Sequence, residues 1–241
     1  MDSAASAHVA ELGGANRVEL CSNLLEGGVT PSAGLIEFVR DRTSIGLQVM
    51  IRPRAADFCY SEDEFETMRR DILVARKIGA DGVVLGILHP DGRVDVERTG
   101  RLVELARPLT VTFHRAVDVS EDIFRALDDI CAAGVDRILT SGGAQTAVHG
   151  IDRLARLVRD AQGRIAIMAG GGVRENNAAS IIERTGVKDI HSGLGSQVAA
   201  STPGPDSEIS SRTMTGVPNR IFQVLQEDVR RLREAVAPAR I

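Results

Sequence analysis

Aromatic side chains are scarce in this chain of 241 residues. They make up 3% of the sequence, with one Tyr and no Trp, so stacking platforms for single-stranded nucleic acid are few. The formal net charge is −4, whereas binding to a nucleic acid or an anionic membrane surface calls for a basic face. We therefore expect no nucleic acid and no membrane among the partners of this protein.

Cysteine is also scarce, and long hydrophobic runs are missing. The three cysteines, Cys21, Cys59 and Cys131, lack the spacing of a zinc knuckle or of a CxxC redox pair. Their small number is typical of a reducing compartment, which predicts a cytoplasmic location. No stretch approaches the ~20 consecutive apolar residues that span a bilayer. The length indicates one domain over residues 1–241, large enough to fold without a disulfide or a metal.

A short repeat organises what is present. A Gly is followed by Ala or Val, two mostly polar residues and a β-branched residue, and the pattern begins at Gly14, Gly79, Gly134 and Gly186. The Gly supplies the left-handed residue that ends a helix, and the β-branched residue begins a buried strand. The spacing is about twice the length of one βα unit, and each gap contains one more strand-like run.

The repeat and the intervening runs predict seven strands that alternate with helices. These strands span Arg17–Cys21, Leu47–Pro53, Gly82–Leu88, Thr110–Ala116, Arg137–Gly142, Arg164–Gly170 and Asp189–Ser192. Such alternation is typical of parallel βαβ units, and repeated right-handed crossovers close into a barrel or open into a doubly wound sheet. We predict an α/β fold, a TIM-type (β/α)8 barrel that is one strand short of eight.

The missing strand is the first one. The helical pattern Ala4–Leu12 follows Met1 almost directly, so the strand that should precede it has no counterpart in the sequence. An open barrel leaves two strand edges unpaired, which is unfavourable. We expect a late-assigned start or a truncated sequence as the cause.

Helix signals are clear elsewhere in the chain. Ser61 and Glu64 form a capping box that begins a long helix, and Ser120-Glu121-Asp122 is expected to cap another. The last helix is predicted over Pro218–Val236. The stretch Ser196–Gly216 is rich in Ser, Thr, Pro and Gly and is predicted to be a long loop.

Polar side chains collect where the predicted strands end. Strands of a parallel barrel are covered on both faces and should be apolar, so the following polar residues need a reason: Glu19, Cys21, Arg52, Arg54, His114, Arg115, Asp118, Ser141 and His191. Period-two alternation directs Glu19, Arg52 and His114 into the mouth of the barrel. A plain alternative is a buried ion-pair network that only fills the barrel.

These residue types fit acid/base chemistry on a small anionic ligand. Glu19 or His114 would act as the general base, and Asp118 completes the candidate catalytic set. Arginine side chains bind carboxylate or phosphate groups. The substrate-binding candidates are therefore Arg52, Arg54 and Arg115, together with Ser141 and His191.

A glycine run follows the sixth predicted strand. Gly170, Gly171 and Gly172 precede a predicted helix, and backbone N–H groups in such a turn can bind an anion. The alternative is that these glycines only form a tight turn. The run is neither a GxGxxG fingerprint nor a P-loop, so we expect no nucleotide cofactor.

The motifs around these residues resemble those of the CutC family, the copper homeostasis proteins. The resemblance is carried by Glu19-Leu20-Cys21 with Glu26–Ser32, by Met50–Arg54 with Asp57–Ser61, by Thr112–Asp118, by Leu139–Gly143, by Met168–Gly172 and by His191. It implies a TIM-type barrel, a cytoplasmic location and a homo-oligomer, a dimer or tetramer. It also implies copper handling, including Cu(I) binding through cysteines.

The sequence departs from the family pattern in two places. Family members carry a first strand with a Glu and a Cys near its end, so a two-cysteine Cu(I) site involving that strand cannot form here. The tail after His191 is shorter and lacks the aromatic and basic run of many relatives. Cu(I) prefers soft thiolate ligands, and Cys21 and Cys59 remain as metal candidates, with His114 as a third ligand.

Three functions stay open from the sequence. The first is copper binding in copper homeostasis. The second is an enzyme that acts on a small phosphorylated or carboxylated metabolite with Glu19 or His114 as base. The third is a catalytically silent scaffold, because the barrel fold alone does not choose among functions.

Overall fold

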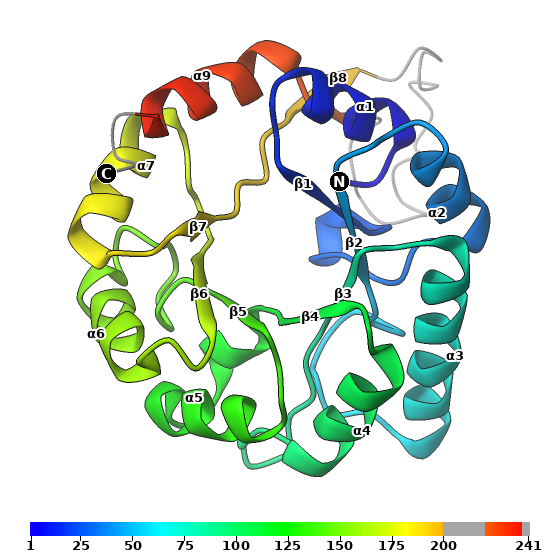
Figure 1. Ribbon diagram of the computed structural model, residues 1–241, viewed down its shortest axis with the longest axis vertical. Helices are drawn as coiled ribbons and strands as arrows, with labels where there is room; N and C mark the ends of the chain where they lie inside the picture. Colours follow the sequence, from blue (N-terminus) through cyan, green and yellow to red (C-terminus); the bar gives the residue numbers. More distant parts are fainter. Residues whose placement is uncertain (200–219, 238–241) are drawn as a thin grey trace, which may run out of the picture.

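Seven parallel strands form one curled sheet in the computed structural model, which describes residues 1–199 and 220–237 (Figure 1). The strands pair in sequence order: β1 (Arg17–Leu20), β2 (Gly46–Met50), β3 (Gly82–Leu85), β4 (Thr110–Phe113), β5 (Arg137–Thr140), β6 (Ala166–Ala169) and β7 (Asp189–Ile190). This order confirms the predicted barrel topology. Each strand is shorter than predicted, so His114, Ser141 and Gly170 follow the strands rather than lie within them.

A ring of helices covers the outside of the sheet. The helices are α1 (Ala4–Leu12), α2 (Ala33–Arg40), α3 (Glu62–Ile78), α4 (Val96–Ala106), α5 (Ile123–Ala132), α6 (Ile151–Ala161), α7 (Glu175–Thr185) and α9 (Gln226–Val236). Two short 3₁₀ turns, η1 (Leu24–Glu26) and η2 (Arg115–Val119), follow β1 and β4. Helix α9 packs against both α7 and α1 and so completes the ring (Figure 1). Within the described ranges, no helix is both long enough and apolar enough to cross a membrane.

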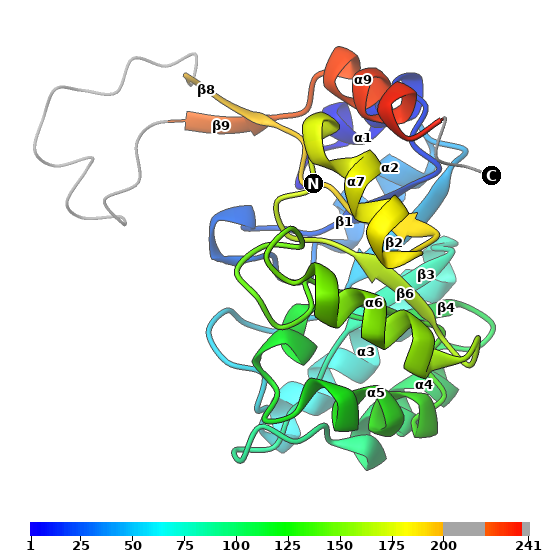
Figure 2. The ribbon, with the colours of Figure 1, turned by 90° about the vertical axis from the view of Figure 1, so that its left-hand side faces the viewer.

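The prediction for the C-terminal part was wrong in two respects: the first residues of the predicted long loop form strand β8 (Ser196–Ala199), and the last helix begins later than predicted. The last helix begins at Gln226, because Arg220–Gln223 forms strand β9. This strand pairs in antiparallel fashion with β8 in a ribbon that projects from the barrel (Figure 2). The β-branched Ile221 and the aromatic Phe222 are residue types that are enriched in strands. Residues 200–216 of the predicted loop lie outside the described residues.

The helix ends follow the predicted glycine pattern. Gly14, Gly79, Gly134 and Gly186 all have positive φ angles, between 75° and 95°, which L-residues with a side chain adopt only with strain. At the helix starts, the capping box of Ser61 with Glu64 is present.

Helix α5 begins within the predicted capping segment Ser120-Glu121-Asp122. Its N-cap is Asp122, whose carboxylate accepts hydrogen bonds from the backbone N–H groups of Phe124 and Arg125. Ser120 instead donates its hydroxyl to the carbonyl of Val117 and belongs to the preceding turn. The carboxylate closest to the free N–H groups takes the cap position.

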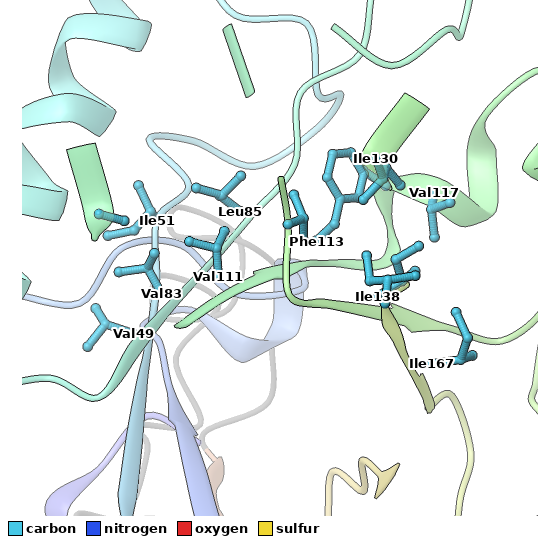
Figure 3. Packing of buried hydrophobic residues seen from close by; sticks show 14 of the residues in the cluster. Val49, Ile51, Val83, Leu85, Val111, Phe113, Val117, Ile130, Ile138 and Ile167 are labelled. Atoms are coloured by element: carbon cyan, nitrogen blue, oxygen red, sulfur yellow. The ribbon is translucent and has the colours of Figure 1, made fainter. Parts of the chain in front are cut away.

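The hydrophobic core lies between the sheet and the helices. Alternate residues of each strand point outward into it, among them Val49, Ile51, Val83, Leu85, Val111, Phe113, Ile138 and Ile167 (Figure 3). Fully burying each of these side chains stabilises the fold by about 1.5–3 kcal/mol. Because these residues face the helices, their neighbours along each strand face the barrel interior.

The two ends of the sheet are not hydrogen-bonded to each other within the described residues. The seven strands agree with the predicted absence of one strand. Across the opening, the guanidinium of Arg17 on β1 lies 3.2 Å from a carboxylate oxygen of Asp189 on β7. Arg137 on β5 binds the same carboxylate at 3.1 Å. The Asp189 carboxylate thus links β1, β5 and β7 through ion pairs.

Candidate functional site

Arg52 and His114 meet at the carboxyl ends of β2 and β4. Both residues are 5% exposed. The phenyl ring of Phe58 lies 5.0 Å from the Arg52 guanidinium carbon and 5.0 Å from the His114 ring. Strand alternation predicted an inward position for both side chains, and the structure brings them together under one aromatic ring.

His114 is a neutral hydrogen-bond donor in this environment. Burial, and secondarily the charge of Arg52, lowers its pKa from 6.5 to about 3. Its Nδ1 accepts a hydrogen bond from the backbone N–H of Ala116 at 3.2 Å, so the ring proton is on Nε2. No described residue accepts a hydrogen bond from that buried Nε2.

Arg52 is a buried cation without a carboxylate partner among the described residues. Its guanidinium donates only to backbone carbonyls, those of Glu26, Gly28 and Ala56, at 2.9–3.0 Å. Its Nε is buried and unpaired within the same set of residues. A buried charge is unfavourable unless it is paired, and among the described residues backbone carbonyls offset the charge of Arg52.

Two aromatic residues of the loop after β2 complete the site. Neither was predicted as a site residue from the sequence. Phe58 covers the pair, and Tyr60 is buried with its hydroxyl close to the Arg52 guanidinium, which lowers the Tyr60 pKa and so opposes the effect of burial. Burial raises the pKa of Tyr60 to about 12, so its hydroxyl stays protonated and can donate. The available signal was that two of the few aromatic residues of the chain stand within one short loop.

Asp118 organises a second group of polar residues at the ends of β4 and β5. Its side chain is 6% exposed. It accepts hydrogen bonds from the Thr140 hydroxyl (2.5 Å) and from the backbone N–H groups of Ser141 (3.1 Å) and Gly143 (2.9 Å). It also pairs with the Arg115 Nε at 2.7 Å. Both oxygens of this carboxylate are hydrogen-bonded, so Asp118 holds the turn after β5 against the end of β4.

The glycine turn after β6 lies against this second group. A Cβ at Gly171 would come within 3.4 Å of the Arg115 guanidinium carbon and 3.2 Å of the Ser141 Cβ, so only glycine leaves the approach open. Arg115 also donates to the Ser141 hydroxyl at 3.0 Å. Gly171 and Gly172 have positive φ angles of 94° and 73°. A Cβ at Gly170 would collide with the Leu139 side chain.

Glu19 and His191 form a separate pair at the opening of the sheet. The His191 Nδ1 lies 3.9 Å from a carboxylate oxygen of Glu19. Both residues line a cavity between β1 and β7, whose described walls do not include Arg52 or His114. The structure therefore divides the predicted catalytic residues among three places, with Glu19 beside His191, His114 near Arg52 and Asp118 beside Arg115.

Arg54 is turned away from the mouth. Its guanidinium pairs with Glu64 at 2.6 Å and with Asp57 at 2.9 Å, and it donates to the Cys59 carbonyl at 2.8 Å. These contacts raise the pKa of Arg54, chiefly through the hydrogen bond to Asp57. They neutralise its charge inside the loop after β2, so Arg54 supports the loop.

The two candidate metal ligands are not brought together. Cys21 is 2% exposed and packs inside the barrel with Met50 and Val84. Cys59 is half-buried and packs against the outer core. Burial raises the pKa of both thiols, which disfavours the thiolate that binds metals. Within the described residues, no group of three or more His, Cys, Asp or Glu side chains is arranged to bind a metal.

Fold and site together define a TIM-type barrel with a basic site at the carboxyl ends of its strands, where active sites lie in this architecture. Comparison with known proteins specifies the class further. The chain belongs to the CutC family, whose sequence profile matches residues 1–196.

Relatives and a solved structure support this assignment. A CutC family protein of Xanthomonas axonopodis pv. citri (strain 306) is 45% identical over 232 residues, 94% of this chain and 97% of the relative. The copper homeostasis protein cutC homolog of Mus musculus is 47% identical over 191 residues, 79% of this chain and 70% of the relative. The crystal structure of a CutC protein from Streptococcus agalactiae has a TM-score of 0.69 and 38% identity, covering 73% of this chain and 87% of that one.

Proposed function

We propose that this protein binds a small anionic molecule, such as a phosphorylated or carboxylated metabolite, at Arg52 and His114. The observation that carries the proposal is the buried guanidinium of Arg52, which has no carboxylate partner among the described residues. The Nε2–H of His114, whose ring contacts the same Phe58 ring as Arg52, is also unpaired among the described residues. An anion would neutralise the first group and accept a hydrogen bond from the second.

The chemistry that these residues support is binding and polarisation. With a pKa of about 3 and an occupied Nδ1, His114 donates a hydrogen bond to an oxygen rather than taking a proton. The Tyr60 hydroxyl is a further donor. Buried donors aimed at one oxygen stabilise negative charge that develops there. If the protein is an enzyme, these hydrogen-bond donors would stabilise the negative charge that develops on a substrate oxygen.

Ligand binding is tested by calorimetric titration and thermal unfolding with inorganic phosphate and malonate as probes. A ligand at a hundredfold its Kd adds about 2.7 kcal/mol of stability, which for a domain of this size is a rise in Tm of roughly 5–10 °C. We expect Arg52→Met to weaken binding at least about tenfold, or 1.4 kcal/mol.

The matched control is Arg54→Met. Arg54 lies two residues further along the chain, and Glu64 and Asp57 already neutralise it, so its replacement should leave the affinity unchanged. The proposal would be contradicted if neither probe bound saturably, or if the two variants bound a probe equally well.

A second candidate function is Cu(I) binding within copper homeostasis. The specific observation is that Cys21 and Met50 pack together on Gly28. A Cβ at that glycine would lie 3.1 Å from the Cys21 Sγ and 3.7 Å from the Met50 Cε. Metal binding releases the proton of the thiol, and the resulting thiolate with the thioether forms a soft donor pair that suits Cu(I). Cys59 stands apart from this pair, so we propose Cys21 and Met50, rather than the two cysteines, as ligands.

Anaerobic titration of Cu(I) against a competing chelator tests this second candidate. We expect Cys21→Ser to weaken binding by at least about tenfold. Cys59→Ser is the matched control and should match the unmodified chain. Equal affinities of all three proteins would contradict the site, and an equal loss in both variants would favour the two-cysteine arrangement instead.

A further inference from the structure

Gly86 faces the barrel interior between the two strands that lead to Arg52 and His114. It directly follows β3, which pairs with β2 on one side and with β4 on the other (Figure 1). Its neighbours Leu85 and Ile87 belong to the hydrophobic core on the helix side, so by alternation position 86 points inward. At this level of the sheet, the middle strand therefore contributes no side chain.

The register of the three strands brings Gly86 level with both site residues. Met50 of β2 pairs with Val84 of β3, and Val84 pairs with Thr112 of β4. Two residues further along the three strands stand Arg52, Gly86 and His114. Adjacent strands lie about 4.8 Å apart, so the backbones of the two site residues are roughly 10 Å apart, with the glycine between them.

The His114 ring lies directly over Gly86. A Cβ at position 86 would be 2.7 Å from both the Cε1 and the Nδ1 of His114, and 3.1 Å from the Cε1 of Phe113. Non-bonded carbon atoms pack at about 3.5–4.0 Å. Even the smallest side chain at this position would therefore collide with the imidazole.

A shift of the ring would break several contacts. Its Nδ1 accepts the hydrogen bond from the Ala116 N–H at 3.2 Å. The centroids of the Phe58 and Phe113 rings lie 5.0 and 6.1 Å from that of His114, and the same Phe58 ring lies 5.0 Å from the Arg52 guanidinium carbon. A displaced imidazole would leave the aromatic ring that it shares with Arg52, and the buried Ala116 N–H would lose its acceptor.

We infer that Gly86 is a positioning residue of the anion site: because it contributes no side chain, the His114 ring can lie across the middle strand and reach the Phe58 ring that also contacts Arg52. Gly86 acts through His114 and need not contact the anion. The inference rests on the proposed function for its effect on binding, whereas its effect on the ring is measurable in the ligand-free protein.

Gly86→Ala tests the inference through the protonation of His114. In the unmodified chain, burial lowers the pKa of His114 to about 3, so the ring should not titrate between pH 5 and pH 7.5. A ring that is pushed towards water regains a pKa near its ordinary value of about 6.5, and we expect it to titrate within this range in the variant. The measurement is the ¹⁵N chemical shift of the ring nitrogens against pH. Malonate should also bind the variant at least about tenfold more weakly.

The matched control is Gly82→Ala, on the same strand and the same inward face. A Cβ at Gly82 would meet the side chains of Gln48 and Thr110, so this substitution crowds the barrel at a lower level than His114. It should lower Tm, as Gly86→Ala does, but leave the His114 titration and the malonate affinity unchanged. Equal changes of the His114 titration in the two variants would contradict a specific role of Gly86.

A double-mutant cycle with His114→Ala keeps the test decisive if Gly86→Ala does not fold. If the new Cβ collides with the ring, Gly86→Ala should lower Tm by on the order of 5 °C in the unmodified background. In the His114→Ala background, where that space is free, the loss should be less than half as large. An unfolded Gly86→Ala chain that folds again with His114→Ala supports the inference, and unfolding in both backgrounds contradicts it.

The inference is overturned if the loss of Tm is equal in both backgrounds, or if His114 stays neutral between pH 5 and pH 7.5 in a folded Gly86→Ala chain. The proposed function fails separately, if neither malonate nor inorganic phosphate binds the unmodified chain. In that case the ligand-free titration and the cycle still decide whether Gly86 positions the ring.

Discussion

Asp118→Ala should destabilise the protein by about 3–5 kcal/mol, the largest loss we expect from a single polar substitution. The change removes a buried carboxylate that accepts from the Ser141 and Gly143 N–H groups and pairs with Arg115. Those donors would then be buried without a partner, which costs about 1–3 kcal/mol each when it is not relieved by water. Urea unfolding of the variant and the unmodified chain measures the difference.

The matched control for this substitution is Asp122→Ala. Asp122 is also an aspartate that accepts from two backbone N–H groups, but it caps α5 in an exposed position, where the loss is typically about 1 kcal/mol. Asp118→Asn keeps the shape and should lie between the two. A loss for Asp118→Ala no larger than that for Asp122→Ala would show that the ends of β4 and β5 do not depend on this carboxylate.

Acidification from pH 7 to pH 5 should lower the free energy of unfolding by about 2 kcal/mol through His114 alone. The pKa of His114 is about 3 in the folded protein and returns to about 6.5 in the unfolded chain. Between pH 3 and pH 6.5 the unfolded state holds one more proton than the folded state. The contribution of His114 to the free energy of unfolding is therefore fully present above pH 6.5. It is lost as the pH falls, at about 1.4 kcal/mol per unit.

The difference between two stability profiles isolates this contribution. His114→Asn removes the titrating ring and retains an acceptor for the Ala116 N–H. Between pH 6.5 and pH 4, its free energy of unfolding should therefore fall less steeply with decreasing pH, by about 1.4 kcal/mol per pH unit. His8→Asn, at an exposed position of α1, is the control for loss of a histidine. Parallel profiles for the unmodified chain and His114→Asn would mean that His114 is not buried as the structure places it.

The sequence predicted the order and the direction of the strands because glycine stops and buried β-branched runs are local signals. Gly79 and Gly186 end helices because each adopts a positive φ angle, which depends on the glycine itself and not on distant contacts. The position of the last helix was not predictable in this way, because Arg220–Gln223 becomes a strand only by pairing with Ser196–Ala199. That pairing depends on a contact between distant parts of the chain.

The candidate site was predictable in its residues and only partly in its grouping. Alternation placed Glu19, Arg52 and His114 inside the barrel, since side chains of a strand change face at each residue. It did not show that Glu19 lies with His191 and away from His114, because the closure of the sheet decides which inward residues meet. The protonation state of His114 was also hidden, since it depends on burial beside Arg52.

The central claim is that an anion binds directly to Arg52 and His114. The most direct measurement is nuclear magnetic resonance of the side-chain N–H groups of the ¹⁵N-labelled protein during titration with inorganic phosphate and with malonate. We predict that the Arg52 Nε–H and His114 Nε2–H signals shift together and saturate with one Kd, while the Arg54 Nε–H signal stays in place. Saturable binding that leaves the Arg52 and His114 signals unmoved would contradict the account.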